Sequence, residues 1–182
     1  IKQICHSLYP DDSTDAGKLL RLKQEYFLVS AGLQSCVRSY YRVHGSLDGF
    51  ENAFVYQLND THPILAIPEL MRILMDEYYF EWDEAWNIVT KTFAYTNHTV
   101  MAEALEKWPI YMIKTLLPRL YLIIEEINNR FVAFLRQNGH DEAKIYRLGC
   151  IKDGLVHMAN LGVIASFKVN GVAWLHTEIL KH

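Results

Sequence analysis

The stretch "VYQLNDTHPILAIPELMRI", residues 55–73, decides the fold. It begins as a short apolar run, breaks into a polar group at residues 59–62, and continues as a helical pattern. A second stretch, "AYTNHTV" (94–100), has the same order of apolar residues followed by polar residues and a histidine. A short run rich in valine and aromatic residues predicts a buried strand, and Pro68 suits the first turn of a helix. Each stretch therefore predicts a strand whose carboxyl end carries polar side chains.

The remainder of the chain is dominated by helical periodicity. Apolar residues at three- and four-residue spacing predict one long helix over 15–44. The other predicted segments are helices over 67–80, 81–94, 100–109, 110–117, 118–139, 157–166 and 173–181, strands over 53–58 and 93–96, a hairpin over 150–156, and a turn or short strand over 168–172. Short buried strands between helices indicate a helix-rich α/β fold. In such folds ligands bind at the carboxyl ends of strands, where both polar stretches are expected to lie.

Composition excludes several classes of protein. Hydrophobic residues make up 51% of the 182 residues, and the formal net charge is −3. The chain has no basic run of the kind that binds nucleic acid. Charged residues interrupt the apolar stretches, so no membrane span is predicted. No signal peptide is recognised. Three scattered cysteines without a CxxC pair suit a reducing cytoplasm. Amphipathic patterns run at both ends, which predicts that the chain is a piece of a larger cytoplasmic protein.

A metal site is one interpretation of the polar stretches. Asp60 and His62 have the Asp-x-His spacing that lets two ligands come from one strand end, and His98 could join them. His157 would be a remote fourth ligand. No HExxH or HxH motif supports this interpretation.

Two other interpretations remain open. Residues 59–61 can cap the following helix or close a turn, and His157 and His176 can be hydrogen-bonded core residues. Alternatively, aspartate, asparagine, threonine and neutral histidine beside aromatic rings can bind the hydroxyl groups of a polyol. Spacing and composition do not separate these interpretations.

Longer motifs identify a family. The chain resembles the glycogen, starch and maltodextrin phosphorylases, in matching order and spacing, at "QLNDTHPILAIPELMRIL" (57–74), "KTFAYTNHTV" (91–100), "EALEKWP" (103–109), "LLPRLYLIIEEINNRF" (116–131) and "VNGVAWLHTEIL" (169–180). The likeness covers nearly the whole chain. The segments "FAYTNHT" and "HMANL" look most similar to the bacterial branch.

The resemblance implies an enzyme of the glycosyltransferase B-type fold, with two domains and an active site between them. Such enzymes transfer a terminal α-1,4-linked glucose from a glucan to inorganic phosphate, which gives glucose 1-phosphate with retained configuration. Pyridoxal phosphate, bound through a lysine, takes part through its phosphate group. On this resemblance, residues 1–182 are the second half of the Rossmann-like N-terminal domain, the C-terminal cofactor domain is a missing partner, and the parent enzyme is a homodimer.

The resemblance also implies roles for particular residues. His98 would meet the sugar in the glucose subsite through its ring and backbone carbonyl, and Asp60 would sit beside that subsite with His62 close by. Val172 would lie against the hydroxymethyl group of the sugar. The full set of implied substrate-binding residues is Asp60, His62, His98, Glu106, Asn170 and Val172.

Some positions depart from the family pattern. Ala102 stands where the family commonly has proline, Leu120 replaces a histidine, and Lys168 lies in a segment that often reads glycine-serine-histidine. No lysine of the chain matches the cofactor-lysine motif; the lysines are Lys2, Lys18, Lys23, Lys91, Lys107, Lys114, Lys144, Lys152, Lys168 and Lys181. The chain alone is therefore expected to be inactive. The alternative is a stand-alone module that binds glucan or a protein partner without catalysis.

Overall fold

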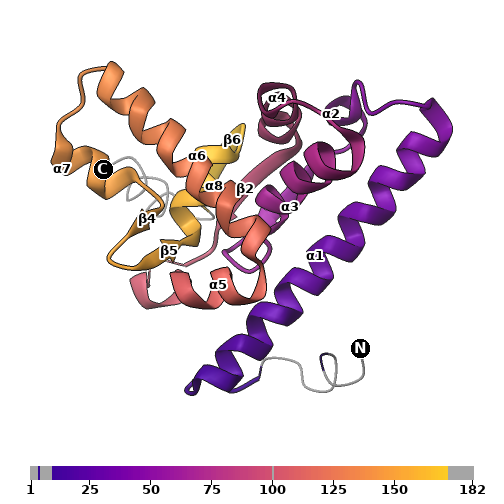
Figure 1. Cartoon of the computed structure of the whole chain (residues 1–182). Helices are drawn as coiled ribbons and strands as arrows, with labels where there is room; N and C mark the ends of the chain where they lie inside the picture. Colours follow the sequence, from indigo (N-terminus) through magenta and orange to yellow (C-terminus); the bar gives the residue numbers. More distant parts are fainter. Residues whose placement is uncertain (1–3, 5–9, 100, 172–182) are drawn as a thin grey trace.

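The computed structural model describes residue 4, residues 10–99 and residues 101–171. It is a mixed α/β structure, rich in helix, with a small parallel sheet (Figure 1). The elements are α1 (Asp15–His44), α2 (Phe50–Ala53), β1 (Tyr56–Asn59), α3 (Ala66–Arg72), the π-helical turn η1 (Ile73–Glu77), α4 (Trp82–Thr92), β2 (Phe93–Asn97), the 3-10 turn η2 (Ala102–Ala104), β3 (Lys107–Pro109), α5 (Ile110–Leu116), α6 (Pro118–Gln137), α7 (Glu142–Leu148), β4 (Ile151–Lys152), β5 (Leu155–His157), α8 (Met158–Ala165) and β6 (Lys168–Gly171).

Helix α1 spans the predicted range and runs along one edge of the molecule (Figure 1). Thr14 caps its first turn by accepting a hydrogen bond from the Gly17 N–H at 3.2 Å. Gly45 ends it in the left-handed conformation (φ 73°) and donates to the Tyr41 carbonyl. The termini of this helix are therefore fixed by local sequence.

Helix α3 is the centre of the hydrophobic core. Six of its seven residues are buried, and it packs against α1, α4 and α6. Glu69 of α3 is fully buried, and its carboxylate accepts hydrogen bonds from Arg72 and from Ser30 of α1. A buried carboxylate needs such partners to remain in a core. Glu69 therefore joins α3 to α1 in one fixed arrangement.

The parallel sheet has the strand order β1-β2-β6. Asn59 of β1 aligns with Thr96 of β2, and Asn97 of β2 aligns with Gly171 of β6. Because all three strands run in the same direction, their carboxyl ends meet at one edge. A second, antiparallel sheet with the order β3-β5-β4 contains the hairpin predicted around residues 153–154.

Several sequence-based expectations need correction. The helix expected over 100–109 is the turn η2 followed by strand β3, because Trp108 pairs with Val156 in the antiparallel sheet. The strand expected from residue 53 begins at Tyr56, since residue 53 still belongs to α2. Helix α7 was not expected. The closing helix over 173–181 lies outside the described residues.

The described residues include no helix that is both long and apolar enough to cross a membrane.

Candidate substrate site at the carboxyl edge of the sheet

The two polar stretches of the sequence meet at the carboxyl edge of the parallel sheet, as predicted. The Asp60 N–H donates to the Thr96 carbonyl at 2.8 Å, which extends the pairing of β1 and β2 by one residue. The Asp60 carboxylate then accepts a hydrogen bond from the His98 N–H at 2.9 Å. The loop after β1 is thereby joined to the loop after β2.

Asp60 lies in a left-handed backbone conformation, with φ 61°. An aspartate tolerates this region better than most residues, although it remains uncommon. The turn directs its carboxylate toward the loop after β2, where the His98 ring nitrogen Nδ1 lies 3.4 Å from the same carboxylate oxygen. Both side chains are only partly exposed, with 35% and 43% of their surface accessible. Hydrogen-bonding groups of both residues are thus available to a ligand.

A cavity of about 700 Å³ opens at this edge. Its polar wall comes from both strand ends, and its remaining walls come from α1, the segment around η2, and the β3–β5 sheet. The lining residues are Asp12, Lys18, Arg21, Asp60, Thr61, His62, Asn97, His98, Thr99, the run 103–109 and Leu155. This volume falls in the range of small-molecule sites. Polar groups beside Trp108 and Leu155 suit a ligand with both hydroxyl groups and apolar faces.

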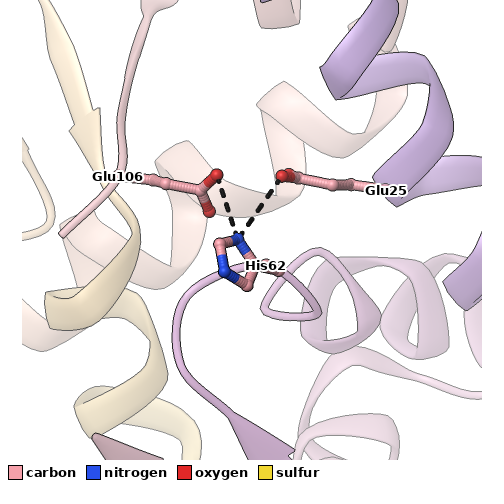
Figure 2. A group of neighbouring side chains, drawn as sticks. All are labelled: Glu25, His62 and Glu106. Carbon is pink, nitrogen blue, oxygen red and sulfur yellow. Dashed lines mark ion pairs between the residues drawn. The ribbon is translucent and has the colours of Figure 1, made fainter. Parts of the chain in front are cut away.

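A cluster of charged side chains, three of which line the cavity, lies next to the strand ends. We call Arg21, Glu25, His62 and Glu106 the Arg21 cluster. Figure 2 shows three of its members, with the carboxylates of Glu25 and Glu106 pointing at one ring nitrogen of His62 from opposite sides. That nitrogen, Nδ1, lies 3.3 Å from Glu106 and 3.8 Å from Glu25.

Arg21 is the central cation of this cluster. One of its terminal nitrogens, Nη2, lies 2.8 Å from Glu106, Nε lies 3.3 Å from Glu25, and Nη1 lies 2.8 Å from Asp12. Nη2 is also 3.2 Å from His62 Nδ1. When His62 is protonated, both of these nitrogens carry hydrogens and cannot bond to each other, so the two cations then form ion pairs with the same oxygen of Glu106.

The ionisation behaviour of the cluster follows from burial and charge. Burial raises the pKa of Glu25 to about 7. Burial also opposes the ionisation of Glu106, but hydrogen bonding with His62 and Glu25 and the charge of Arg21 outweigh it and lower the pKa of Glu106 to about 2. Hydrogen bonding to Glu106 and then to Glu25 raises the pKa of His62 to about 10. At neutral pH the cluster therefore holds a carboxylate at Glu106 and an imidazolium at His62.

The structure brings four of the six sequence-predicted substrate residues to the cavity, namely Asp60, His62, His98 and Glu106. Asn170 lies one strand further, where its side-chain oxygen accepts from the Thr96 hydroxyl at 2.8 Å, and it does not line the cavity. Val172 lies outside the described residues. Their roles toward a substrate stay predictions.

The metal set suggested by the sequence does not form. Asp60, His62 and His98 do not converge with ligand atoms on one point, and His157 lies on β5 outside the cavity lining. In the described part of the chain, the only group with suitably close ligand atoms is Glu25, His62 and Glu106, whose atoms lie within 4.8 Å of one another. Arg21 already contacts that group.

Sequence reasoning missed Arg21, Glu25 and Thr61. The first two are a helical i, i+4 pair of opposite charge, a pattern that more often marks a solvated helix face. Nothing local distinguishes this pair, because its other partners in the cluster, His62 and Glu106, lie on distant segments of the chain.

Comparisons with known proteins bear on the identity of the fold and the cavity. A family model described as carbohydrate phosphorylase matches residues 1–182. A glycogen phosphorylase of Bacillus subtilis is 53% identical over 96% of this chain and 22% of its own length. An Arabidopsis thaliana protein named alpha-glucan phosphorylase 2, cytosolic, is 50% identical over 99% of this chain and 23% of its own length, and glycogen phosphorylase 2 of Dictyostelium discoideum is 49% identical over the whole chain and 19% of its own length. The chain thus spans about a fifth of the length of these relatives.

Proposed function

Because the chain belongs to the carbohydrate phosphorylase family, we propose that it supplies the glucose subsite of an α-glucan phosphorylase. The enzyme would transfer the terminal α-1,4-linked glucose of glycogen or maltodextrin to inorganic phosphate and release glucose 1-phosphate. The observation that carries this proposal is the hydrogen bond from the His98 N–H to Asp60 at the cavity wall. This bond fixes two polar residues, from the loops after two separate strands, at the wall of one cavity.

The geometry supports distinct roles for these two residues. Asp60 uses one carboxylate oxygen for His98, and its carboxylate can accept further hydrogen bonds from sugar hydroxyl groups. The His98 ring, partly exposed beside it, can exchange one more hydrogen bond with the sugar. Contacts of this kind accelerate the reaction to the extent that they strengthen in the transition state, in which the glucosyl group flattens and gains positive charge.

Asn97 helps to shape the wall next to these residues. Its side chain donates to the Thr99 carbonyl at 2.8 Å and accepts from the Thr99 N–H at 3.0 Å, which closes a tight turn directly around His98. A turn held by two hydrogen bonds limits the positions that the His98 ring can take. The residue is therefore suited to a fixed sugar contact.

Membership of the phosphorylase family also suggests which part of a larger enzyme the chain forms. We propose that residues 1–182 form the second half of a Rossmann-like N-terminal domain in a glycosyltransferase B-type fold, with a C-terminal domain and a second subunit as partners. A cytoplasmic location is proposed because the Arabidopsis relative is named cytosolic.

Pyridoxal phosphate, which the family resemblance implies, does not fit the described lysines of this chain. Burial lowers the pKa of Lys152, but its amino group donates to the carbonyls of Tyr146 and Arg147 and does not line the cavity. The cavity is lined by Lys18 and Lys107, and neither matches the family's cofactor-lysine motif. We therefore propose that the cofactor is held by the C-terminal domain and supplies acid–base chemistry through its phosphate. This chain would bind and orient the sugar.

The test is glucose 1-phosphate formation by the full-length enzyme, with Asp60→Asn as the variant and Asp76→Asn as the matched control. Asp76 pairs with Arg119 on the surface and is not part of the cavity lining. We expect Asp60→Asn to lower kcat/KM by about tenfold or more, because the amide loses the negative charge and one of the two acceptor oxygens that the carboxylate offers to His98 and to the sugar. Asp76→Asn should leave it unchanged.

Three outcomes would contradict the proposal. Glucan binding without glucose 1-phosphate formation by the wild-type enzyme would favour the non-catalytic binding module. Loss of activity on chelation, restored by added metal, would favour the metal interpretation. Unchanged kcat/KM in Asp60→Asn would remove Asp60 from the subsite.

A further inference from the structure

We propose that Arg21 of helix α1 is a positioning residue for the glucose subsite: by holding the carboxylate of Glu106, it fixes Thr61 and the neighbouring Asp60 turn. This inference rests on the proposed function, because it concerns how that subsite keeps its shape. The predicted substrate residues do not include Arg21.

The first step is the contact between Arg21 and Glu106. The two residues lie 2.8 Å apart at their closest atoms although they come from distant segments, α1 and the loop between η2 and β3. The side chains are 22% and 10% exposed, so solvent screens the pair only partly. Two further contacts of Arg21, with Asp12 and Glu25, fix the direction of its guanidinium group. A planar group with several anchored donors cannot rotate freely.

The second step leads from Glu106 to the Asp60 turn. The Thr61 hydroxyl donates a hydrogen bond to the carboxylate of Glu106 at 2.9 Å. The backbone N–H of Glu106 in turn donates to the same hydroxyl oxygen at 3.3 Å. Thr61 is 1% exposed, so water has little access to replace these bonds. Thr61 directly follows Asp60, whose left-handed backbone needs support from its surroundings. Movement of Glu106 would therefore move Thr61 and redirect the Asp60 carboxylate.

A bound metal ion is a poorer occupant of the same cluster. Glu25, His62 and Glu106 could offer three ligand atoms, but Nη2 of Arg21 lies 2.8 Å from Glu106 and 3.2 Å from His62. A divalent ion at that point would have to displace the guanidinium group, which carries the same sign of charge. The cation that this cluster accommodates is Arg21 itself.

The experiment compares Arg21→Gln, Arg21→Lys and the control Arg72→Gln in the full-length enzyme. Arg72 compensates another buried carboxylate, Glu69, at the same closest distance of 2.8 Å and with 18% side-chain exposure, but it does not line the cavity. For each variant we would measure kcat and KM for maltodextrin phosphorolysis well below the melting temperature, and the melting temperature itself. The control separates loss of a buried ion pair in general from loss of this one.

We expect Arg21→Gln to lower kcat/KM by about ten- to a hundredfold, the cost of a small misplacement of binding groups. Arg21→Lys should recover part of this loss, because lysine keeps the charge but not the forked geometry. Arg72→Gln should lower the melting temperature and keep kcat/KM within about twofold of wild type.

Two results would overturn the inference alone: an active wild-type enzyme in which Arg21→Gln keeps its kcat/KM, or equal losses of kcat/KM in Arg21→Gln and Arg72→Gln. A wild-type enzyme without phosphorolytic activity would instead overturn the proposed function and this inference together.

Discussion

Glu25 and Glu106 show at the residue scale how position decides the charge of chemically identical groups. Both side chains are about nine-tenths buried, and both face His62. Glu106 lies 2.8 Å from Arg21 and accepts from Thr61, whereas Glu25 has longer contacts, 3.3 Å to Arg21 Nε and 3.8 Å to His62. The better-bonded carboxyl keeps its charge, and the other has its pKa raised by burial.

The raised pKa of Glu25 predicts a pH-dependent contribution to stability. A carboxyl whose pKa rises from 4.5 to about 7 on folding binds more protons in the folded state between these values. Its contribution is therefore fully present below about pH 4.5 and is lost as pH rises through 7. Glu25→Gln, which stays neutral, should gain stability relative to wild type between about pH 5 and pH 8, by roughly 1–3 kcal/mol.

Thermal melting at these two pH values measures the effect. Glu126→Gln, at a half-exposed position of α6, serves as the control and should change with pH as wild type does. Equal pH dependence in wild type and Glu25→Gln would show that Glu25 is ionised in the folded protein throughout this range.

His98 provides a second prediction at this scale. In the full-length enzyme, His98→Ala removes the ring but keeps the backbone N–H, which donates a hydrogen bond to the Asp60 carboxylate. The loss should be about 1–3 kcal/mol of transition-state stabilisation, or roughly ten- to a hundredfold in kcat/KM. Rate, metal content and melting temperature should be measured on one sample. Full specific activity with a lowered melting temperature would make His98 a structural residue.

At the scale of elements, local patterns predicted what local forces determine. The long helix α1 was predicted because its apolar spacing, cap and terminal glycine all lie within the segment. The ends of β1 and β2 were predicted because apolar runs stop at polar residues there. The helix predicted over 100–109 was wrong, because Trp108 pairs with Val156 of β5 and no local pattern reveals this pairing.

The residues of the site also fall into two groups, those that local sequence predicts and those that only tertiary packing reveals. Asp60 and His98 stand in recognisable motifs at strand ends, so the sequence indicated them. Arg21 acquires its importance from Glu106, a residue on a distant segment, and only the packing of α1 brings the two together. Tertiary contacts of this kind leave no periodic pattern in the sequence.

The antiparallel sheet offers a prediction at the scale of elements. The side-chain oxygen of Asn128 on α6 accepts from the N–H groups of Cys150 at 2.9 Å and Ile151 at 3.1 Å, which anchors the start of β4. Asn128→Leu leaves both donors without this acceptor, so we expect a loss of about 1–3 kcal/mol in the free energy of unfolding.

The neighbouring substitution Asn129→Leu is the control, because Asn129 is exposed on the same helix. Chemical denaturation of both variants makes the comparison. A similar small change in both would mean that water or another group replaces the Asn128 oxygen.

At the scale of the whole molecule, the described residues leave strand edges and several large apolar side chains exposed. Within the described ranges, β1 and β6 each pair on one side only, with β2. Large apolar side chains are exposed over several elements, among them Leu28 (73%), Val43 (73%) and Val55 (62%). Surfaces of this kind usually contact another chain or another part of the same protein. This agrees with a chain that spans about a fifth of the length of its relatives.

The open edge of β1 predicts self-association of the 182-residue chain when it is produced alone. Unpaired strand edges beside exposed apolar side chains pair readily with other copies, and a lysine at the edge opposes this pairing. We therefore expect light scattering to give a mass above that of a monomer, rising with concentration, and Val55→Lys to lower it. Val163→Lys, at an exposed position of α8, should have no such effect if the edge of β1 drives the association. A wild-type chain that stays monomeric at high concentration would contradict the prediction, and an equal effect of both lysines would assign the association to general surface hydrophobicity.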